Sequence, residues 1–226
     1  METREAAMIG RLIAGITHET KNVLAIIKES SGLLQDILRL KKRKDVPNAE
    51  QIEKVASRIK AQVARGNEQL AALNWLAHSM SDRSSSVGVN ELSSGAFNLM
   101  QRLARLKQVE FELQPTDDDA TIDADVVRLF FVLATCIEYC LEKEPAKGRI
   151  VLRPKASRGE AILKIASGSA GEGQATERTE ADGGPLPPEL ADLESILGPL
   201  GAKLVFADAG VGTELHLILP LRKGET

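Results

Sequence analysis

The chain has 226 residues, 43% of them hydrophobic and 27% charged, a composition that fits one large or two small globular domains. No apolar run approaches the roughly eighteen residues of a membrane span, and the acidic start lacks the basic flank and apolar segment of a signal peptide, so we expect a cytoplasmic protein that does not bind a membrane. The formal net charge of −3 gives no general attraction to nucleic acid, and no nucleic-acid partner is expected.

Two long helices are predicted at the start of the chain, because apolar and small residues recur there alternately four and three positions apart, which is the heptad spacing. In the first helix these residues are Ile9, Ile13, Ile16, Thr20, Val23, Ile27, Ser30, Leu34 and Ile37. In the second helix, which follows Pro47 and Asn48, they are Ile52, Ala56, Ile59, Val63, Gly66, Leu70, Leu73, Ala77 and Met80. The short turn between the helices predicts an antiparallel helical hairpin over residues 1–82.

A hairpin of this length has only one seam of its own to bury. Each helix would run roughly 50 Å at 1.5 Å per residue, and the apolar side chains outside the seam would stay in water. Pairing with a second copy into a four-helix bundle covers them. We therefore predict a homodimer.

His18 does not belong to the predicted seam. At about 103° per residue it lies about 180° from the centre of the seam, on the opposite side of the first helix. Its neighbours on that side are Arg11, Gly15, Asn22, Ala25 and Glu29. Because several of these residues are small, another protein could approach this face closely.

A lone histidine on a helix is most often an ordinary surface residue, but His18 has a carboxylate beside it, Glu19, and an amide one turn on, Asn22. A carboxylate that accepts the Nδ1 proton leaves Nε2 as a nucleophile with its lone pair outward. Such a nucleophile suits phosphoryl transfer, in which the protein mainly positions an in-line attack on phosphorus. Asn22 could orient the phosphoryl group or a water molecule.

The sequence HETKN, residues 18–22, resembles the H-box of the two-component histidine kinases. The hairpin around it resembles their dimerisation and histidine-phosphotransfer domain. This resemblance implies that His18 is the phosphoacceptor, that Glu19 is its acid–base partner, and that Asn22 acts in phosphotransfer or in phosphatase action. Val23 stands where many such boxes have proline, so the helix should continue without a kink.

The rest of the chain resembles the ATPase domain that follows the hairpin in these kinases. After a Ser-rich linker at 83–89, a domain over 90–226 is predicted, with an α/β sandwich as its fold. Its predicted elements are a helix at about 90–106, an extended segment at 109–115, a helix at 123–144, strands at 149–156 and 160–167, a helix near 188–200, and a closing pair of strands within 202–220. The expected fold class is thus α plus α/β.

The nucleotide-binding residues that the resemblance implies are degenerate. Tyr139 takes the place of an asparagine that helps to hold magnesium, and Ser167 takes the place of an aspartate that binds adenine. The segment 168–188, at the place of the lid over the phosphates, has the composition of a mobile loop. Only Gly210 to Thr213 matches well. We therefore expect no cofactor of its own, with ATP binding unlikely.

An intact acceptor hairpin with an eroded nucleotide pocket resembles a dimeric histidine phosphotransferase of a phosphorelay. This resemblance implies that His18 exchanges phosphoryl groups with receiver-domain aspartates of response regulators, with Mg²⁺ held by the receiver. Two alternatives stay open. One is an ATP-dependent sensor histidine kinase without a sensor domain of its own, and the other is a non-catalytic dimeric adaptor or receiver phosphatase.

No metal site is predicted. His78 and His216 have no partner at ligand spacing, and Cys136 and Cys140, four positions apart in an apolar run, are expected to be buried thiols. The acidic residues of TDDDATIDAD lack the spacing of a calcium loop and resemble a turn that precedes a helix cap.

Overall fold

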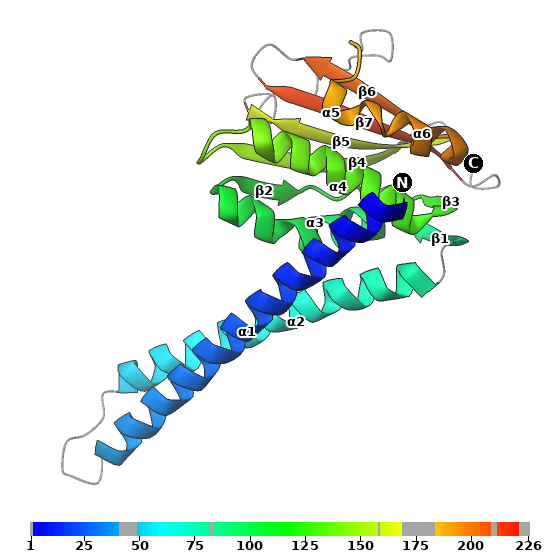
Figure 1. The fold of residues 1–226 in the computed structure, drawn as a ribbon. Helices are drawn as coiled ribbons and strands as arrows, with labels where there is room; N and C mark the ends of the chain where they lie inside the picture. Colours follow the sequence, from blue (N-terminus) through cyan, green and yellow to red (C-terminus); the bar gives the residue numbers. More distant parts are fainter. Residues whose placement is uncertain are drawn as a thin grey trace. The chain divides into compact units, whose positions relative to one another are not determined.

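The chain forms a helical hairpin followed by a mixed α/β domain, as the sequence predicts (Figure 1). The structure is a computed structural model that describes residues 2–40, 49–81, 84–157, 159–168, 184–208 and 212–221. The chain divides into two compact units, Met1–Asn74 and Trp75–Thr226. Within the described residues, no helix combines the length and apolar character needed to cross a membrane.

The first unit consists of α1 (Glu2–Leu40) and most of α2 (Ala49–Ser81). The helix α1 continues through Val23, as predicted from the absence of proline at that position. Its buried apolar side chains are separated by one, three, four and seven positions, which places them on one face of the helix. They are Met8, Ile9, Leu12, Ile16 and Val23.

The predicted seam is only partly correct. Ile13 of α1 is 42% exposed, and Val63 and Leu70 of α2 are 45% and 52% exposed. In α2 the buried positions lie one residue before the predicted ones. Val55 is buried instead of Ala56, and Gln69 is buried instead of Leu70. The apolar face of each helix is wider than one helix–helix seam, so the spacing alone does not say which part of it faces the partner helix.

The second unit contains a five-stranded sheet with the order β2-β4-β5-β7-β6. The edge strand β2 is parallel to β4, and the other neighbours are antiparallel. The bounds of these strands are β2 (Glu110–Leu113), β4 (Arg149–Ser157), β5 (Glu160–Ser167), β6 (Lys203–Asp208) and β7 (Thr213–Pro220). The sheet confirms the α/β character predicted for this part of the chain.

A separate two-stranded sheet pairs β1 (Ser84–Gly88) with β3 (Thr121–Asp125). Residues 84–88 of the linker predicted at 83–89 thus form a strand, and the boundary between the compact units falls within α2 rather than at residue 82. Serine-rich sequence is typical of linkers, but a serine-rich strand is stable when it pairs along its whole length with a neighbour.

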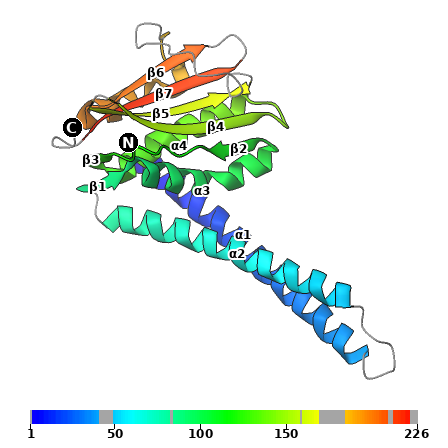
Figure 2. The ribbon, with the colours of Figure 1, turned by 180° about the vertical axis from the view of Figure 1, so that it is seen from behind.

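The helices of the second unit lie on one face of the five-stranded sheet (Figures 1 and 2). They are α3 (Val89–Lys107), α4 (Val126–Lys143), the short α5 (Pro188–Ala191) and α6 (Glu194–Leu197), and a 3₁₀ turn, η4 (Gly198–Leu200). The apolar helix α4 supplies much of the core, including the fully buried Phe130 and Leu133. It begins at Asp125, whose carboxylate accepts the Arg128 N–H as an N-cap.

Trp75, near the end of α2, packs within the second unit against α3 and α4. A Cβ atom on Gly95 of α3 would lie only 2.6 Å from the Trp75 ring, so glycine is needed for this approach. The indole also meets Phe130 edge to face, with 5.7 Å between ring centroids. This aromatic contact joins the last turns of α2 to the core of the α/β domain.

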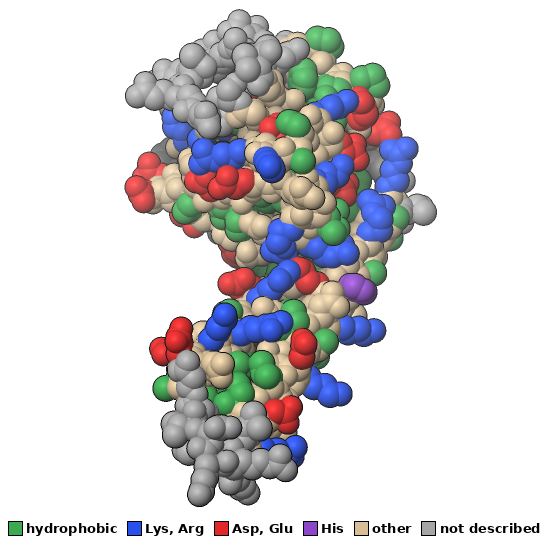
Figure 3. All heavy atoms as spheres, turned by 90° about the vertical axis from the view of Figure 1, so that its left-hand side faces the viewer, with side chains coloured by type: hydrophobic (Ala, Val, Ile, Leu, Met, Phe, Trp, Pro, Cys, Tyr) green, Lys and Arg blue, Asp and Glu red, His purple; other side chains and the backbone are tan. Residues whose placement is uncertain are grey.

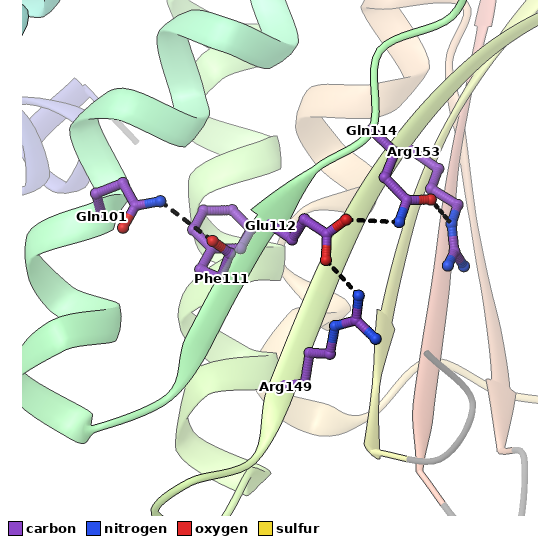
Figure 4. A network of polar contacts seen from close by, with 6 residues as sticks. All are labelled: Gln101, Phe111, Glu112, Gln114, Arg149 and Arg153. Carbon is purple, nitrogen blue, oxygen red and sulfur yellow. Dashed lines mark hydrogen bonds and ion pairs between the residues drawn. The ribbon is translucent and has the colours of Figure 1, made fainter. Parts of the chain in front are cut away.

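On the other face of the sheet, polar side chains connect β2 with β4 (Figure 4). Glu112 pairs with Arg149, and the Gln114 amide donates to Glu112 at 2.7 Å while accepting from Arg153 Nε at 2.6 Å. The hydrogen bonds from Arg149 and Gln114 hold the pKa of the Glu112 carboxyl below its usual range. These contacts tie the short parallel edge strand to the sheet.

Further along the same face, Glu214 of β7 accepts from two basic side chains. Lys164 Nζ and His216 Nε2 each lie 2.6 Å from Glu214 Oε1. Burial alone would raise the pKa of Glu214, but the hydrogen bonds from His216 and Lys164 outweigh it and lower this pKa to about 2. His216 therefore has a structural partner that its position in the sequence did not reveal.

We expect Gly95→Ala to lower the free energy of unfolding by about 1–3 kcal/mol, because the added methyl group overpacks the Trp75 contact. Urea denaturation followed by Trp75 fluorescence measures the change. Gly32→Ala is the control, since a Cβ atom at Gly32 of α1 meets nothing within 4 Å. Equal stability of Gly95→Ala and wild type would contradict the packing described.

We expect Glu214→Gln to lower the free energy of unfolding at pH 7 by about 2 kcal/mol, through lost charge-assisted hydrogen bonds. The folded-state pKa is depressed, so this stability is present above the unfolded pKa of about 4.5. This contribution to the free energy of unfolding is lost as the pH falls toward 2. Urea titrations across this range should show the gap between variant and wild type closing, whereas Glu160→Gln, at an exposed position, should match wild type throughout.

Candidate functional site

The three residues predicted to carry the chemistry lie within one turn near the middle of α1. His18 and Asn22 are both exposed, and Glu19 is half-buried. Residues four apart on a helix lie one above the other, and the His18 Nδ1 atom is 3.5 Å from Asn22 Nδ2. As placed, the Asn22 Nδ2 group donates to His18 Nδ1; with the amide turned over, its oxygen would instead accept a hydrogen bond from Nδ1–H, which leaves the Nε2 lone pair pointing outward.

The Glu19 carboxylate is directed at α2 instead. Its Oε1 atom accepts from Nη2 of Arg65 in an ion pair between the two helices. The Glu19 side chain is 12% exposed, and that of Arg65 is 39% exposed. The structure therefore brings His18 and Asn22 together and adds Arg65, a residue that the sequence reasoning missed.

Two further contacts fix α1 against α2 beside His18. The Thr20 hydroxyl donates to Gln69 Oε1 at 3.1 Å, and this glutamine is buried. One turn on, Val23 lies 3.4 Å from the position that a Cβ atom on Gly66 would take, so the glycine allows a close approach. The α2 segment from Arg65 to Gln69 thus forms the support on which the H-box turn of α1 rests.

His18 lies on neither the buried stripe of α1 nor the stripe of its exposed apolar residues. At about 100° per residue, it lies roughly 130° from the centre of the buried stripe. The angle is smaller than the predicted 180° because Met8 and Leu12 are buried while Ile13 is exposed. The exposed apolar residues Ile13, Leu24 and Leu38 lie roughly 140° away on the other side. A protein that covers this apolar stripe would leave the imidazole accessible.

The surface of the hairpin combines charge with exposed apolar groups. Lys and Arg side chains are spread over the face drawn in Figure 3, and apolar side chains stand between them near the turn end of the hairpin. Lys21, three positions after His18, is an exposed basic residue of α1. A basic surrounding favours the approach of an anionic phosphoryl group.

The two residues that replace expected nucleotide ligands are engaged with protein groups. Tyr139 is 9% exposed and meets Phe206 edge to face, with 6.4 Å between ring centroids. Lys143 Nζ lies 5.2 Å from the centroid of the Tyr139 ring and 3.4 Å from Glu189 Oε1. Ser167 is buried, and its hydroxyl accepts the Thr213 N–H at 3.2 Å. The predicted lid, for residues 169–183, and Gly210 lie outside the described residues.

Among the described residues, no group of three or more His, Cys, Asp or Glu side chains could hold a metal ion. Cys136 and Cys140 are buried free thiols, as predicted. Burial raises the pKa of Cys136 to about 12 and also raises that of Cys140, so neither thiol is a nucleophile at neutral pH. In the acidic segment 117–119, Asp119 accepts the Asn90 N–H at the start of α3, which is a helix-cap role.

No family model matches the sequence, and no curated protein matches it. Among solved structures, the nucleotide-free catalytic domain of histidine kinase ThkA is 18% identical, with 61% of this chain and 95% of that chain covered and a TM-score of 0.49. Histidine kinase ThkA in complex with response regulator protein TrrA is 16% identical, with 99% of this chain and 65% of that chain covered and a TM-score of 0.49.

Histidine kinase AdeS of Acinetobacter baumannii is 15% identical, with 87% of this chain and 97% of that chain covered and a TM-score of 0.46. At such identities and TM-scores, no residue role or partner carries over to this chain. The solved structures that this chain resembles are histidine kinases or their catalytic domains.

Proposed function

We propose that this chain is a histidine phosphotransfer protein of two-component signalling, in which His18 exchanges phosphoryl groups with receiver-domain aspartates of response regulators. The observation that carries the proposal is the placement of His18. Its ring is exposed, its Nδ1 atom faces Asn22, and it lies on neither the buried stripe nor the exposed apolar stripe of α1.

The chemistry follows from an imidazole held at Nδ1. His18 Nε2 attacks the phosphorus of a receiver's aspartyl phosphate, forming a P–N bond while the bond from phosphorus to the aspartate oxygen breaks. The electron pair of that bond stays on the aspartate carboxylate. Asn22 orients the ring, and the Nδ1 proton passes to Glu19 as the acid–base partner. Any magnesium ion used in this step belongs to the receiver.

The proposal includes no ATP-dependent step. It is supported by Tyr139, whose phenol cannot serve as the amide ligand of magnesium and whose ring packs on Phe206. It is also supported by Ser167, which has no carboxylate for an adenine amino group and uses its hydroxyl on the Thr213 N–H. These contacts favour phosphotransfer over the alternative of an ATP-dependent kinase.

We also propose that two copies pair through the hairpin to form a four-helix bundle. The support is the large apolar side chains left exposed on one stripe of each helix: Ile13, Leu24 and Leu38 on α1, and Val63 and Leu70 on α2. Several of them recur at heptad-like intervals beside the intramolecular seam, which is the pattern of a bundle with a second interface. His18 would remain outside that interface.

We expect His18→Ala to abolish phosphate uptake from an acetyl-phosphate-loaded receiver, and Asn22→Ala to slow it by roughly tenfold or more. Gel autoradiography for acid-labile phosphate on the protein measures both. His78→Ala, at another exposed histidine on a helix, is the control and should label normally. Equal labelling of His18→Ala and wild type would refute the proposal.

Two other outcomes of that assay identify the alternatives. Faster loss of receiver phosphate without label on His18 would indicate a receiver phosphatase. Labelling of His18 by γ-labelled ATP in the absence of any receiver would indicate a kinase.

We expect the double variant Val63→Glu and Leu70→Glu to be monomeric, because charges would replace the exposed apolar stripe of α2. Multi-angle light scattering at micromolar concentration measures the mass. Leu106→Glu is the control, since Leu106 is 63% exposed on α3 and lies outside the hairpin. A wild-type chain that is itself monomeric under these conditions would overturn the homodimer.

A further inference from the structure

We propose that Arg65 acts as a latch on Glu19: their ion pair holds the carboxylate away from His18 and must open before Glu19 can take the Nδ1 proton. This inference rests on the proposed function, because it assigns a regulator to the same site. Arg65 is thus a positioning residue that acts through Glu19.

The first support is the direction of the Glu19 side chain. Although Glu19 is adjacent to His18 in the sequence, successive residues of a helix point about 100° apart. The carboxylate follows its own direction to Arg65 on α2, while the Nδ1 atom of His18 meets Asn22. In this arrangement Glu19, the proton acceptor of the proposed reaction, is paired with the Arg65 guanidinium.

The second support is that the closed latch leaves Arg65 incompletely satisfied. Its Nε atom is buried and, among the described residues, has no hydrogen-bond partner. A buried N–H without an acceptor is unfavourable, so the closed arrangement is not the best one for the guanidinium. The Arg65 side chain is 39% exposed and therefore has a path out toward solvent.

A phosphorylated receiver would open the latch by competing with Glu19 for Arg65. Its phosphoryl group is an anion, and a guanidinium binds phosphate oxygens through two parallel hydrogen bonds. As this group approaches His18, it competes with Glu19 for Arg65. The Glu19 carboxylate released in this way can accept the His18 Nδ1 proton while a phosphorylated receiver is bound. Without a phosphorylated receiver, it stays paired with Arg65.

The latch can be tested without any receiver, because the chain has only three histidines and selective ¹⁵N-histidine labelling gives few signals. At one fixed pH, we expect Arg65→Gln to shift the ring ¹⁵N resonances of His18, as the Glu19 carboxylate, no longer paired with Arg65, binds Nδ1. Adding Glu19→Gln to this variant should return them to the wild-type position. His18→Ala assigns the signals.

The matched control is Arg58→Gln. Arg58 of α2 pairs with Glu29 of α1 at 3.9 Å, also between the two helices, but with both side chains more than half exposed. Its loss removes an ion pair of the hairpin without freeing Glu19, so the His18 resonances should stay in place. If Arg58→Gln moves them as much as Arg65→Gln does, or if the Arg65→Gln shift persists without Glu19, the latch is refuted.

Transfer kinetics give the second readout. From a phosphorylated receiver, we expect Arg65→Gln to take up phosphate roughly threefold to tenfold faster than wild type, and the double variant to be no faster than Glu19→Gln alone. Slower uptake by Arg65→Gln would show that Arg65 assists the reaction and would overturn the latch. If even wild type takes up no phosphate, the proposed function fails, and the resonance experiment still decides the latch.

Discussion

The register between α1 and α2 is the constraint on which the candidate site depends. Three contacts set it within five residues of His18: the ion pair of Glu19 with Arg65, the hydrogen bond of Thr20 with Gln69, and the close approach of Val23 to Gly66. Sliding one helix by a turn would break all three at once. Because each contact uses a residue within or next to the segment 18–22, the face that His18 presents is determined by polar and steric fit as well as by apolar burial.

The second unit is stabilised by apolar packing, including at a position where a nucleotide ligand was expected. Its sheet and helices are held by an aliphatic core around α4 and by the Trp75 contact at Gly95. At the position where a nucleotide ligand was expected, Tyr139 packs on Phe206 and is covered by Lys143. An aromatic side chain in this place contributes packing to the domain, which an asparagine facing a ligand would not do.

Much of the architecture was predictable because it depends on periodicity. The heptad spacing located both long helices, and the apolar run ending before Pro145 located α4. Periodicity could not say which part of a wide apolar face meets the partner helix, so Val63 and Leu70 were placed in the seam although they are exposed. It also could not show β1, since five residues rich in serine form a strand only through their pairing with β3.

Of the candidate site, the sequence predicted which residues share a helix face, and it did not predict their contacts across the hairpin. His18 and Asn22 share a face at a spacing that the sequence displays, and the structure places them in contact. The partner of Glu19 is 46 positions away, and only the register of the hairpin brings Arg65 to it. The usable signal was the polar sequence around Gly66, where Arg65 and Gln69 flank a seam glycine and could have been expected to face α1.

The packing of Tyr139 against Phe206 has a pharmacological consequence. Under the proposed phosphotransfer, which has no ATP-dependent step, compounds that compete with ATP would block no step of this chain. A pathway that runs through this chain would then tolerate such compounds at this step. Interference would have to come from molecules that cover the surface around His18 or that separate the proposed pair of hairpins.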